Sequence, residues 1–336
     1  AMKQYTVAVV GATGAVGREM LETLEARQFP VQTLRPMASA RSAGTKVKFA
    51  GADVLVEDLE TASLGGIDIA LFSAGGSVAT EWAPRFAAAG AVVIDNSSAF
   101  RYDARYPLVV PEVNPEAIED HPGIIANPNC STIQLVVALK PLHDAAGIER
   151  IIVSTYQSAS GAGQKGVWEL WNAVKARVEG EQEPAPSTFP HPLAFDVIPQ
   201  IDVFQDNGYT KEEMKMTWET RKILGLPELE VSATCVRVPV LRGHSEAVTL
   251  DLARPLGADE ARALLSNAPG IKLWDDPANK RYPLARLADG NDETWVGRIR
   301  SDNERPNTLH LWVVSDNLRK GAALNAVQIA ELLTHD

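Results

Sequence analysis

Cys130 lies where a turn gives way to a long apolar run, in the stretch IIANPNCSTIQLVVALK. We expect residues 131–146 to form a helix, which places Cys130 at or beside its first turn. The unpaired N–H groups and the dipole at a helix start stabilise a thiolate and lower a thiol pKa that is ordinarily about 8.5. A small buried residue beginning a core helix is the alternative, and position alone does not decide between the two. Cys235, inside the β-like run SATCVRV, is interpreted as a core residue.

A nucleophilic thiol needs a partner that handles protons, and His244 is the best candidate among six histidines. It follows Gly243 at the tip between two β-like runs, where an imidazole can reach into a cleft. Arg237 ends the preceding run and can point to the same side. Either residue alone is more often structural. The pair at one strand–turn–strand junction favours a site.

The stretch VVGATGAVG places Gly11, Gly14 and Gly17 directly after a strand-like run and at the start of a helical one. The first glycine allows a tight turn, and the second lets backbone N–H groups approach a pyrophosphate. The helix start adds partial positive charge for that anion. In this context the glycines predict a dinucleotide site.

The end of the second strand-like run separates NAD from NADP. Sites specific for NAD place an Asp or Glu there for the ribose 2′-OH, but no acidic residue occurs from residue 26 to residue 52. Instead, ASARSAG supplies Ser39, Arg41 and Ser42. A guanidinium flanked by two hydroxyls suits a 2′-phosphate, so the sequence favours NADP.

The elements that must position these residues fall into two groups. Residues 1–128 alternate β-like runs with helical stretches, which indicates right-handed crossovers and a parallel sheet. After Cys130 the runs suit a mixed or antiparallel sheet. We therefore predict an α/β protein: a Rossmann-type doubly wound domain, 1–128, and a second α+β catalytic and dimerisation domain, 129–318, with a C-terminal helix, 319–336, packing back on the first. The expected strands are 5–11, 31–38, 67–74, 91–97, 149–160, 230–240, 245–253, 294–302 and 308–316. The expected helices are 18–28, 79–90, 131–146, 164–180 and 319–333. Residues 183–199 are expected to form a Pro-rich loop.

Composition excludes several classes of protein. The 336 residues are 45% hydrophobic and 22% charged, as in ordinary globular proteins. No run is long enough to span a membrane, and we expect no membrane or metal partner. Two distant cysteines without a secretory signal predict a cytoplasmic location. A net charge of -11 argues against nucleic acid, and it requires a local Arg and Lys cluster for any anionic substrate.

Five motifs together resemble the bacterial type of aspartate-β-semialdehyde dehydrogenase, and they cover nearly the whole chain in order. They are VVGATGAVG, NPNCSTIQ, TYQSASGAG, KEEMKMTWETRKIL and RVPVLRGHSEAV. The resemblance implies reductive dephosphorylation of L-aspartyl-4-phosphate to L-aspartate-4-semialdehyde through a cysteine thioester, with release of phosphate. It places the reaction in lysine, threonine, methionine and diaminopimelate biosynthesis. It also implies a homodimer.

The resemblance assigns a role to each matching residue. Cys130 would be the nucleophile, His244 the acid/base, and Gln157 a residue that orients the substrate. Arg237 would bind the substrate carboxylate and Glu212 its amine, although Glu213 is adjacent and either could face the cleft. The phosphate site would be Arg101, Asn129 and Lys215. The cofactor contacts would be Gly11, Thr13, Gly14, Ala15, Val16, Ser39, Arg41, Ser42, Ser73, Ser160, Gly161 and Asn317.

Three alternatives stay open at this point. A sister acyl-phosphate reductase, such as N-acetylglutamyl-phosphate reductase, shares the cofactor and thiol chemistry, although the KEEMK helix and Arg237 favour the aspartyl substrate. A thiol hydrolase also uses a Cys–His pair, but it has no need of the glycine loop. A non-enzymatic NADP sensor could keep the same fold.

Overall fold

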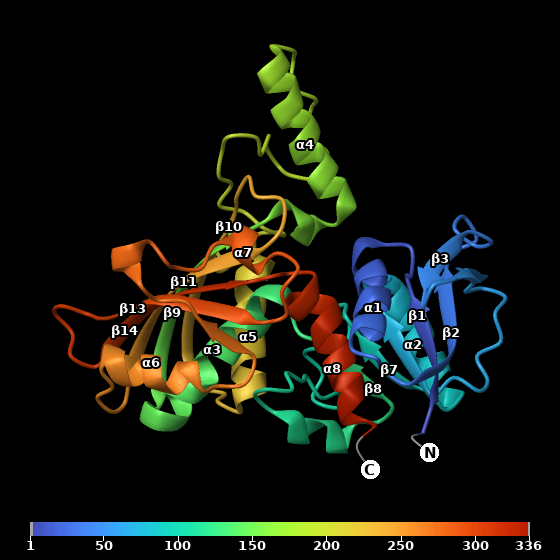
Figure 1. Cartoon of the computed structure of the whole chain (residues 1–336), viewed down its shortest axis with the longest axis horizontal. Helices are drawn as coiled ribbons and strands as arrows, with labels where there is room; N and C mark the ends of the chain where they lie inside the picture. Colours follow the sequence, from blue (N-terminus) through green and yellow to red (C-terminus); the bar gives the residue numbers. More distant parts are fainter. Residues whose placement is uncertain (1–2, 335–336) are drawn as a thin grey trace. The chain divides into compact units, whose positions relative to one another are not determined.

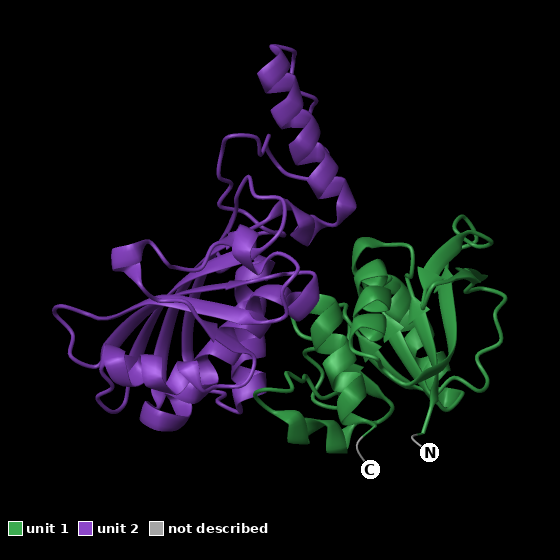
Figure 2. Ribbon diagram, in the orientation of Figure 1, with its two compact units in different colours: residues 1–129, 322–336 green, residues 130–321 purple. Residues whose placement is uncertain are grey.

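The computed structural model describes residues 3–334, and the chain forms two compact units. Unit 1 comprises residues 1–129 and 322–336, and unit 2 comprises residues 130–321 (Figure 2). Within the described residues, none of the helices is both long and apolar enough to cross a membrane.

Unit 1 is built on a six-stranded sheet whose strands all run parallel (Figure 1). The apolar runs that form its centre are buried on both faces, as expected of a parallel sheet covered by helices. The strand order is β5 (Glu57–Asp58), β2 (Val31–Ala38), β1 (Tyr5–Val10), β6 (Ile69–Phe72), β7 (Val92–Asp95) and β8 (Ile124–Ala126). This is the predicted doubly wound arrangement.

Three helices cover the sheet of unit 1: α1 (Ala15–Ala26), α2 (Gly76–Ala88) and α8 (Leu324–Leu332). Helix α8 comes from the far end of the chain and packs against α1. Its Val327 and Ala330 are fully buried in the core of the unit. Arg27 and Glu331 join the two helices through two hydrogen bonds of 2.5 and 2.8 Å.

Unit 2 contains a mixed six-stranded sheet, also as predicted. The strand pair at each edge of this sheet is parallel: β10 with β9 at one edge, and β12 with β13 at the other. The other strand pairs are antiparallel. Helices α3 (Cys130–Ala146), α5 (Lys211–Leu224) and α6 (Ala258–Ser266) cover one face and enclose the larger core. The strand order is β10 (Glu230–Arg237), β9 (Ile148–Gln157), β11 (His244–Leu252), β14 (Thr308–Ser315), β13 (Thr294–Ser301) and β12 (Ile271–Leu273).

Helix α4 (Gln164–Glu179) projects away from the sheet of unit 2 (Figure 1). Its Leu170 packs with Phe189 and Ile198 of the Pro-rich loop in a small separate core. The side of α4 that bears Trp168 and Trp171 stays exposed, at 63% and 59%.

Several elements differ from the sequence prediction. The strand expected at 149–160 ends at Gln157, because the chain turns into a 3-10 helix at Ala159–Ala162. The last helix starts where expected, but its first turn, Arg319–Ala323, is π-helical and leads directly into α8. The hairpin of β3 (Lys46–Phe49) and β4 (Ala52–Leu55), and the short elements β5, β8, α6, β12 and α7 (Ala285–Ala288), were not anticipated.

Candidate active site

Cys130 is the first residue of α3, and its side chain is partly exposed. The π-helical turn packs directly against it: a Cβ built on Gly321 would lie 3.0 Å from the Cβ of Cys130. The thiol is thus held at a helix start, where the free N–H groups favour a thiolate. Cys235 is completely buried, as predicted for a core residue, and burial raises its thiol pKa well above the ordinary value.

His244 begins β11 and is completely buried. The backbone N–H of Ser158 donates to its Nδ1 at 3.0 Å. Burial, and secondly the positive charge of Arg237, lower the pKa of His244 from 6.5 to about 3. The other ring nitrogen, Nε2, has no hydrogen-bond partner within the described part of the chain. The imidazole is therefore neutral at physiological pH and presents one nitrogen to the site.

Arg237 lies at the end of β10, and its side chain and that of His244 both lie next to Gly161. Its Nη1 donates to the carbonyl oxygen of Ser158 at 2.8 Å. A Cβ built on Gly161 would lie 2.7 Å from Nη1 of Arg237 and 3.2 Å from Nε2 of His244. Burial lowers the pKa of Arg237, while the negative charges of Glu212 and of a Cys130 thiolate raise it. Arg237 is thus within electrostatic reach of both anions.

The two acidic residues at the start of α5 make different contacts. Glu213 accepts hydrogen bonds from the backbone N–H groups of Thr210 and Cys235, the former as part of a capping box. Glu212 instead faces Lys215 at 3.3 Å and Gln157 at 3.5 Å. The geometry therefore favours Glu212 as the carboxylate that faces the site. Lys215 also pairs with Asp202 at 3.1 Å.

In unit 1, the glycine loop leads from β1 into the start of α1. Gly11 has a φ of +85°, and a Cβ on Gly17 would lie only 2.0 Å from the carbonyl oxygen of Gly11. Gly14 caps the helix without a side-chain hydrogen bond, and the first turn carries no acidic residue. Thr13, Ala15 and Val16 belong to the same loop and first helical turn, and helix starts of this kind are common phosphate-binding positions.

The turn after β2 presents Arg41 to solvent. The N–H of Ser42 donates to the carbonyl oxygen of Ser39 at 2.9 Å, which closes the turn. Arg41 is exposed, and within residues 3–334 its guanidinium has no carboxylate partner. The carbonyl oxygen of Ser73 lies against Gly11, 2.3 Å from where a Cβ would be.

Arg101 is held beside the segment that leads to the thiol. It is 5% exposed, and its Nε and Nη2 donate to the carbonyl oxygens of Asn127 and Asn96, each at 2.8 Å. Asn127 precedes Cys130 by three residues, and the buried Asn129 precedes it by one.

The structure groups the predicted site residues by unit. Unit 2 brings together Cys130, Gln157, Ser160, Gly161, Glu212, Lys215, Arg237, His244 and Asn317. Unit 1 carries Gly11, Thr13, Gly14, Ala15, Val16, Ser39, Arg41, Ser42, Ser73, Arg101 and Asn129. Sequence reasoning missed Ser158 and Gly321. Ser158 contacts Nδ1 of His244 through both its backbone N–H, at 3.0 Å, and its hydroxyl, at 3.2 Å, and a single serine in a β-like run gave no signal. Gly321 makes room for Cys130 because it has no side chain, and a single glycine gave no signal either.

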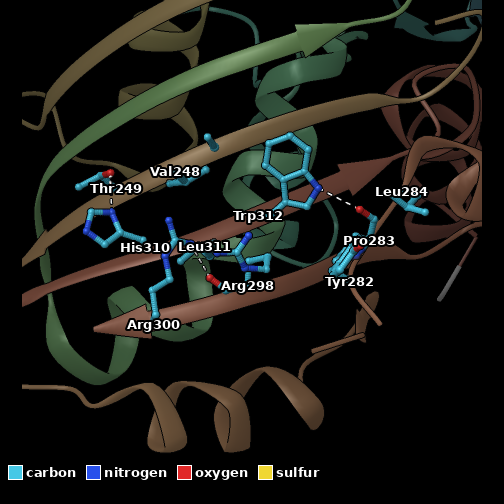
Figure 3. A pocket seen from close by; sticks show the side chains of 11 residues that line it. Val248, Thr249, Tyr282, Pro283, Leu284, Arg298, Arg300, His310, Leu311 and Trp312 are labelled. Carbon is cyan, nitrogen blue, oxygen red and sulfur yellow. Dashed lines mark hydrogen bonds between the residues drawn. The ribbon is translucent and has the colours of Figure 1, made fainter. Parts of the chain in front are cut away.

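A separate cavity of about 330 Å³ in unit 2 is lined by strands β11, β13 and β14 and by the loop at 282–284 (Figure 3). Trp312 forms one side and donates from Nε1 to the carbonyl oxygen of Pro283 at 2.9 Å. The lining contains none of the predicted site residues.

Comparison with known proteins decides the family. Residues 6–121 match the model "Semialdehyde dehydrogenase, NAD binding domain", and residues 139–320 match "Semialdehyde dehydrogenase, dimerisation domain". The aspartate-semialdehyde dehydrogenase of Aquifex aeolicus is 56% identical over 335 residues, covering 99% of this chain and 98% of that one. The chain belongs to the aspartate-semialdehyde dehydrogenase family.

Other relatives agree with this membership. The Bacillus subtilis aspartate-semialdehyde dehydrogenase is 53% identical, covering 97% of this chain and 96% of its own. The crystal structure of aspartate semialdehyde dehydrogenase II from Vibrio cholerae, complexed with ASA, matches with a TM-score of 0.97 at 52% identity and 99% coverage of both chains. A Candida albicans structure with NADP matches with a TM-score of 0.76 at 28% identity, covering 98% of each chain. The chain is therefore a dehydrogenase with an N-terminal NAD(P)-binding domain, and the resemblance found in its motifs is confirmed.

Proposed function

We propose that the chain catalyses the NADP-dependent reductive dephosphorylation of L-aspartyl-4-phosphate to L-aspartate-4-semialdehyde through a thioester on Cys130. The observation that carries the proposal is the position of Cys130 at the start of α3, where the charge of a thiolate would interact with Arg237. The side chains of Arg237 and His244 both lie next to Gly161. The complex of the Vibrio cholerae relative with ASA supports the choice of substrate.

The substrate is a small, strongly anionic molecule, and the site supplies local positive charge that the whole chain lacks. The net charge is -11, so the overall field repels an acyl phosphate. Arg237 offers a two-pronged guanidinium for the carboxylate of the substrate. Glu212 is placed for its ammonium group, beside Gln157. Arg101, Asn129 and Lys215 would receive the phosphate.

In the first step, the Cys130 thiolate attacks the acyl carbon, the carbonyl oxygen becomes an oxyanion, and the C–O bond to phosphate breaks. The backbone N–H groups at the start of α3 and Nε2 of His244 are the donors available to that oxyanion. The product is an acyl thioester and free phosphate. In the biosynthetic direction NADPH supplies the hydride that reduces this thioester.

The residues of unit 1 fit NADP. The open start of α1 suits the pyrophosphate, and the exposed Arg41 between Ser39 and Ser42 suits the 2′-phosphate. The Candida albicans relative with NADP supports this choice.

Replacing Arg41 with Ala tests the cofactor assignment. The KM for NADP should rise by about 10-fold or more, because a charge-assisted bond to the 2′-phosphate contributes about 1.5–3 kcal/mol. The KM for NAD should change little. Initial rates with each cofactor measure both constants. Equal effects on the two would show that Arg41 is not at the 2′ position.

The decisive test of the proposed function is phosphate-dependent reduction of NADP with aspartate semialdehyde, run beside Cys130→Ser. The wild type should be active, and the variant should lose essentially all activity because the covalent route is removed. Cys235→Ala is the matched control, since that thiol is buried in the core, and it should keep most of the activity. Activity with N-acetylglutamyl semialdehyde alone would reverse the choice of substrate.

We also place the enzyme in the cytoplasm, in the biosynthesis of lysine, threonine, methionine and diaminopimelate, as a homodimer. The dimerisation-domain match over residues 139–320 supports the assembly. On β9 the face opposite the helices exposes Ile152 and Tyr156, at 39% and 36%, and the Tyr156 ring packs on Trp312. We infer that this apolar face, with the cavity of Figure 3 beside it, is the dimer contact.

A further inference from the structure

We propose that the lobe formed by α4 and the Pro-rich loop, residues 164–198, holds Arg237 in place, and that Phe189 is the positioning residue through which it does so. The inference rests on the proposed function for the role of Arg237, which is to bind the carboxylate of the substrate. It assigns a part in that binding to a segment that contains none of the predicted site residues.

The backbone of Arg237 is paired with the end of this lobe. Ile198 and Arg237 form an antiparallel bridge in which each backbone N–H donates to the carbonyl oxygen of the other, at 2.9 and 2.8 Å. Ile198 also belongs to the small core of the lobe, together with Leu170, Phe189 and Leu193. The main chain of Arg237 is therefore fixed to the edge of that core.

The side chain of Arg237 lies against the same core. Its guanidinium carbon is over the ring of Phe189, 5.6 Å from the ring centroid. Both residues are buried, with 7% of Arg237 and 6% of Phe189 exposed. A cation over an aromatic face is attracted by the quadrupole of the ring, and the attraction is stronger where water is excluded. The ring therefore helps to fix the guanidinium electrostatically as well as by packing.

An aromatic ring holds this arginine without using the groups that a substrate needs. Nη1 of Arg237 donates to the carbonyl oxygen of Ser158 at 2.8 Å. Within residues 3–334 no carboxylate forms an ion pair with the guanidinium. A carboxylate partner would neutralise its charge and occupy its N–H donors, whereas a ring does neither. The charge and the remaining donors of Arg237 thus stay available to an incoming carboxylate.

Phe189 can position Arg237 because it is itself held from two sides. A Cβ built on Gly166 of α4 would lie 3.0 Å from Cζ of the Phe189 ring, so the ring is in close contact with the helix. Glu169 on the same helix accepts hydrogen bonds from the backbone N–H groups of Thr188, at 2.6 Å, and of Phe189, at 3.2 Å. The tip of the ring and the backbone behind it are thus both fixed to α4.

A second pair in the lobe has the same chemistry at the surface. The guanidinium carbon of Arg177 lies over the ring of Phe195, 5.7 Å from its centroid. Phe195 is 63% exposed, and Arg177 forms an ion pair with Glu183 at 2.6 Å. This arginine is already paired with a carboxylate and faces solvent. Phe195 is therefore a matched control for Phe189.

The contact is tested first without substrate or cofactor, by NMR of the protein labelled with ¹⁵N-arginine. The Nε–H signal of Arg237, assigned with Arg237→Lys, should move in Phe189→Leu, because an aromatic ring shifts the resonances of nuclei over its face. Phe195→Leu should leave that signal in place and move the signal of Arg177 instead. An Arg237 signal that is the same in the wild type and in Phe189→Leu would overturn the proposal.

The second test weakens the interaction while keeping the shape of the side chain. Phenylalanine that carries one, two or three fluorine atoms on its ring is incorporated at position 189, because each fluorine draws negative charge away from the ring face. The KM for aspartate semialdehyde should rise with the number of fluorine atoms, and by roughly 5- to 30-fold in Phe189→Leu, while kcat changes little. The same series at position 195 should leave both constants unchanged.

A substrate without the carboxylate separates loss of positioning from general damage to the fold. The aldehyde 3-aminopropanal lacks only the carboxylate of aspartate semialdehyde, so its kcat/KM should stay within about 2-fold of the wild-type value in each variant. Equal losses with both aldehydes, or a KM for aspartate semialdehyde that does not respond to fluorine, would overturn the proposal. A wild type that turned over neither aldehyde would refute the proposed function instead, and the NMR experiment would still decide whether Phe189 holds Arg237.

Discussion

Glu246 is a carboxylic acid buried completely in unit 2, two residues after His244 on the same strand. It pairs across the sheet with Thr155 and Val313, and neither of its oxygens has a hydrogen-bond partner within residues 3–334. Burial raises the pKa of Glu246 well above its ordinary value, so the folded protein holds it as a neutral acid. A buried neutral acid of this kind lowers the free energy of unfolding, because its carboxyl group can ionise only after the chain unfolds.

We therefore expect Glu246→Gln to stabilise the protein increasingly as pH rises. Above the ordinary pKa of 4.5, the unfolded wild type loses the proton that the folded state keeps. Wild-type stability then falls by up to about 1.4 kcal/mol per pH unit until the pH reaches the folded pKa. Glutamine removes this dependence. Urea unfolding of both proteins at about pH 5, 6, 7 and 8 measures the difference. Glu228→Gln, at an exposed position, is the control, and a pH-independent difference for Glu246→Gln would contradict the expectation.

At the scale of single residues, the sequence identifies residues that act through their side chains more readily than residues that act through their main chain. Cys130 at a helix start and His244 after Gly243 were found from residue type and spacing, because thiols and imidazoles are few. Glu212 and Glu213 could not be separated, since adjacent helical positions look alike until their hydrogen bonds are known. The part played by the Ser158 N–H is available to any residue except proline, so no sequence pattern marks it.

At the scale of elements, the π-helical turn at Arg319–Ala323 explains why a glycine stands at 321. The sequence indicated one continuous helix, because its apolar stripe runs through the turn without a break. The turn brings Gly321 against Cys130, with 3.0 Å to Cβ and 3.4 Å to Cα from a built Cβ. Such irregular turns are frequent at functional sites.

Gly321→Ala should therefore displace the thiol and lower kcat. The new methyl group must push Cys130 by a few tenths of an ångström, and misplacement of a reacting atom by about 1 Å can cost about 10²-fold. We expect a 10-fold or larger loss of kcat, and slower alkylation of Cys130, without comparable loss of thermal stability. Gly257→Ala is the matched control, because open space surrounds that glycine and its φ is -75°. Full activity of Gly321→Ala would show that the turn tolerates the shift.

At the scale of the whole molecule, the alternation of strands and helices was enough to predict the doubly wound sheet, and the later β-like runs predicted the mixed one. The strand order of unit 2 could not be predicted from the sequence. Strands β9 and β10 pair in parallel, although 72 residues separate them along the chain, and no local sequence pattern indicates this pairing. Long-range pairing of this kind is set by core packing, in which α3, α5 and α6 share one face.

The proposed dimer belongs to this scale, and a charged residue on the open sheet face tests it. Tyr156→Glu should dissociate the dimer, because the carboxylate would be buried without a partner in the interface. Light scattering across protein concentrations measures the assembly. Leu55→Glu, at an apolar position 59% exposed in unit 1, is the control and should leave the assembly unchanged. An intact Tyr156→Glu dimer would place the contact elsewhere.

Unit 1 is made from both ends of the chain, whereas unit 2 is one uninterrupted segment. Ribosomes synthesise the N-terminal part first, yet the core around α1 lacks Val327, Ile329 and Ala330 until those residues emerge. Unit 1, although its strands are translated first, therefore cannot complete its core until the whole of unit 2 has been synthesised. Removing residues 322–334 would leave apolar surface on α1 uncovered while sparing every residue of unit 2.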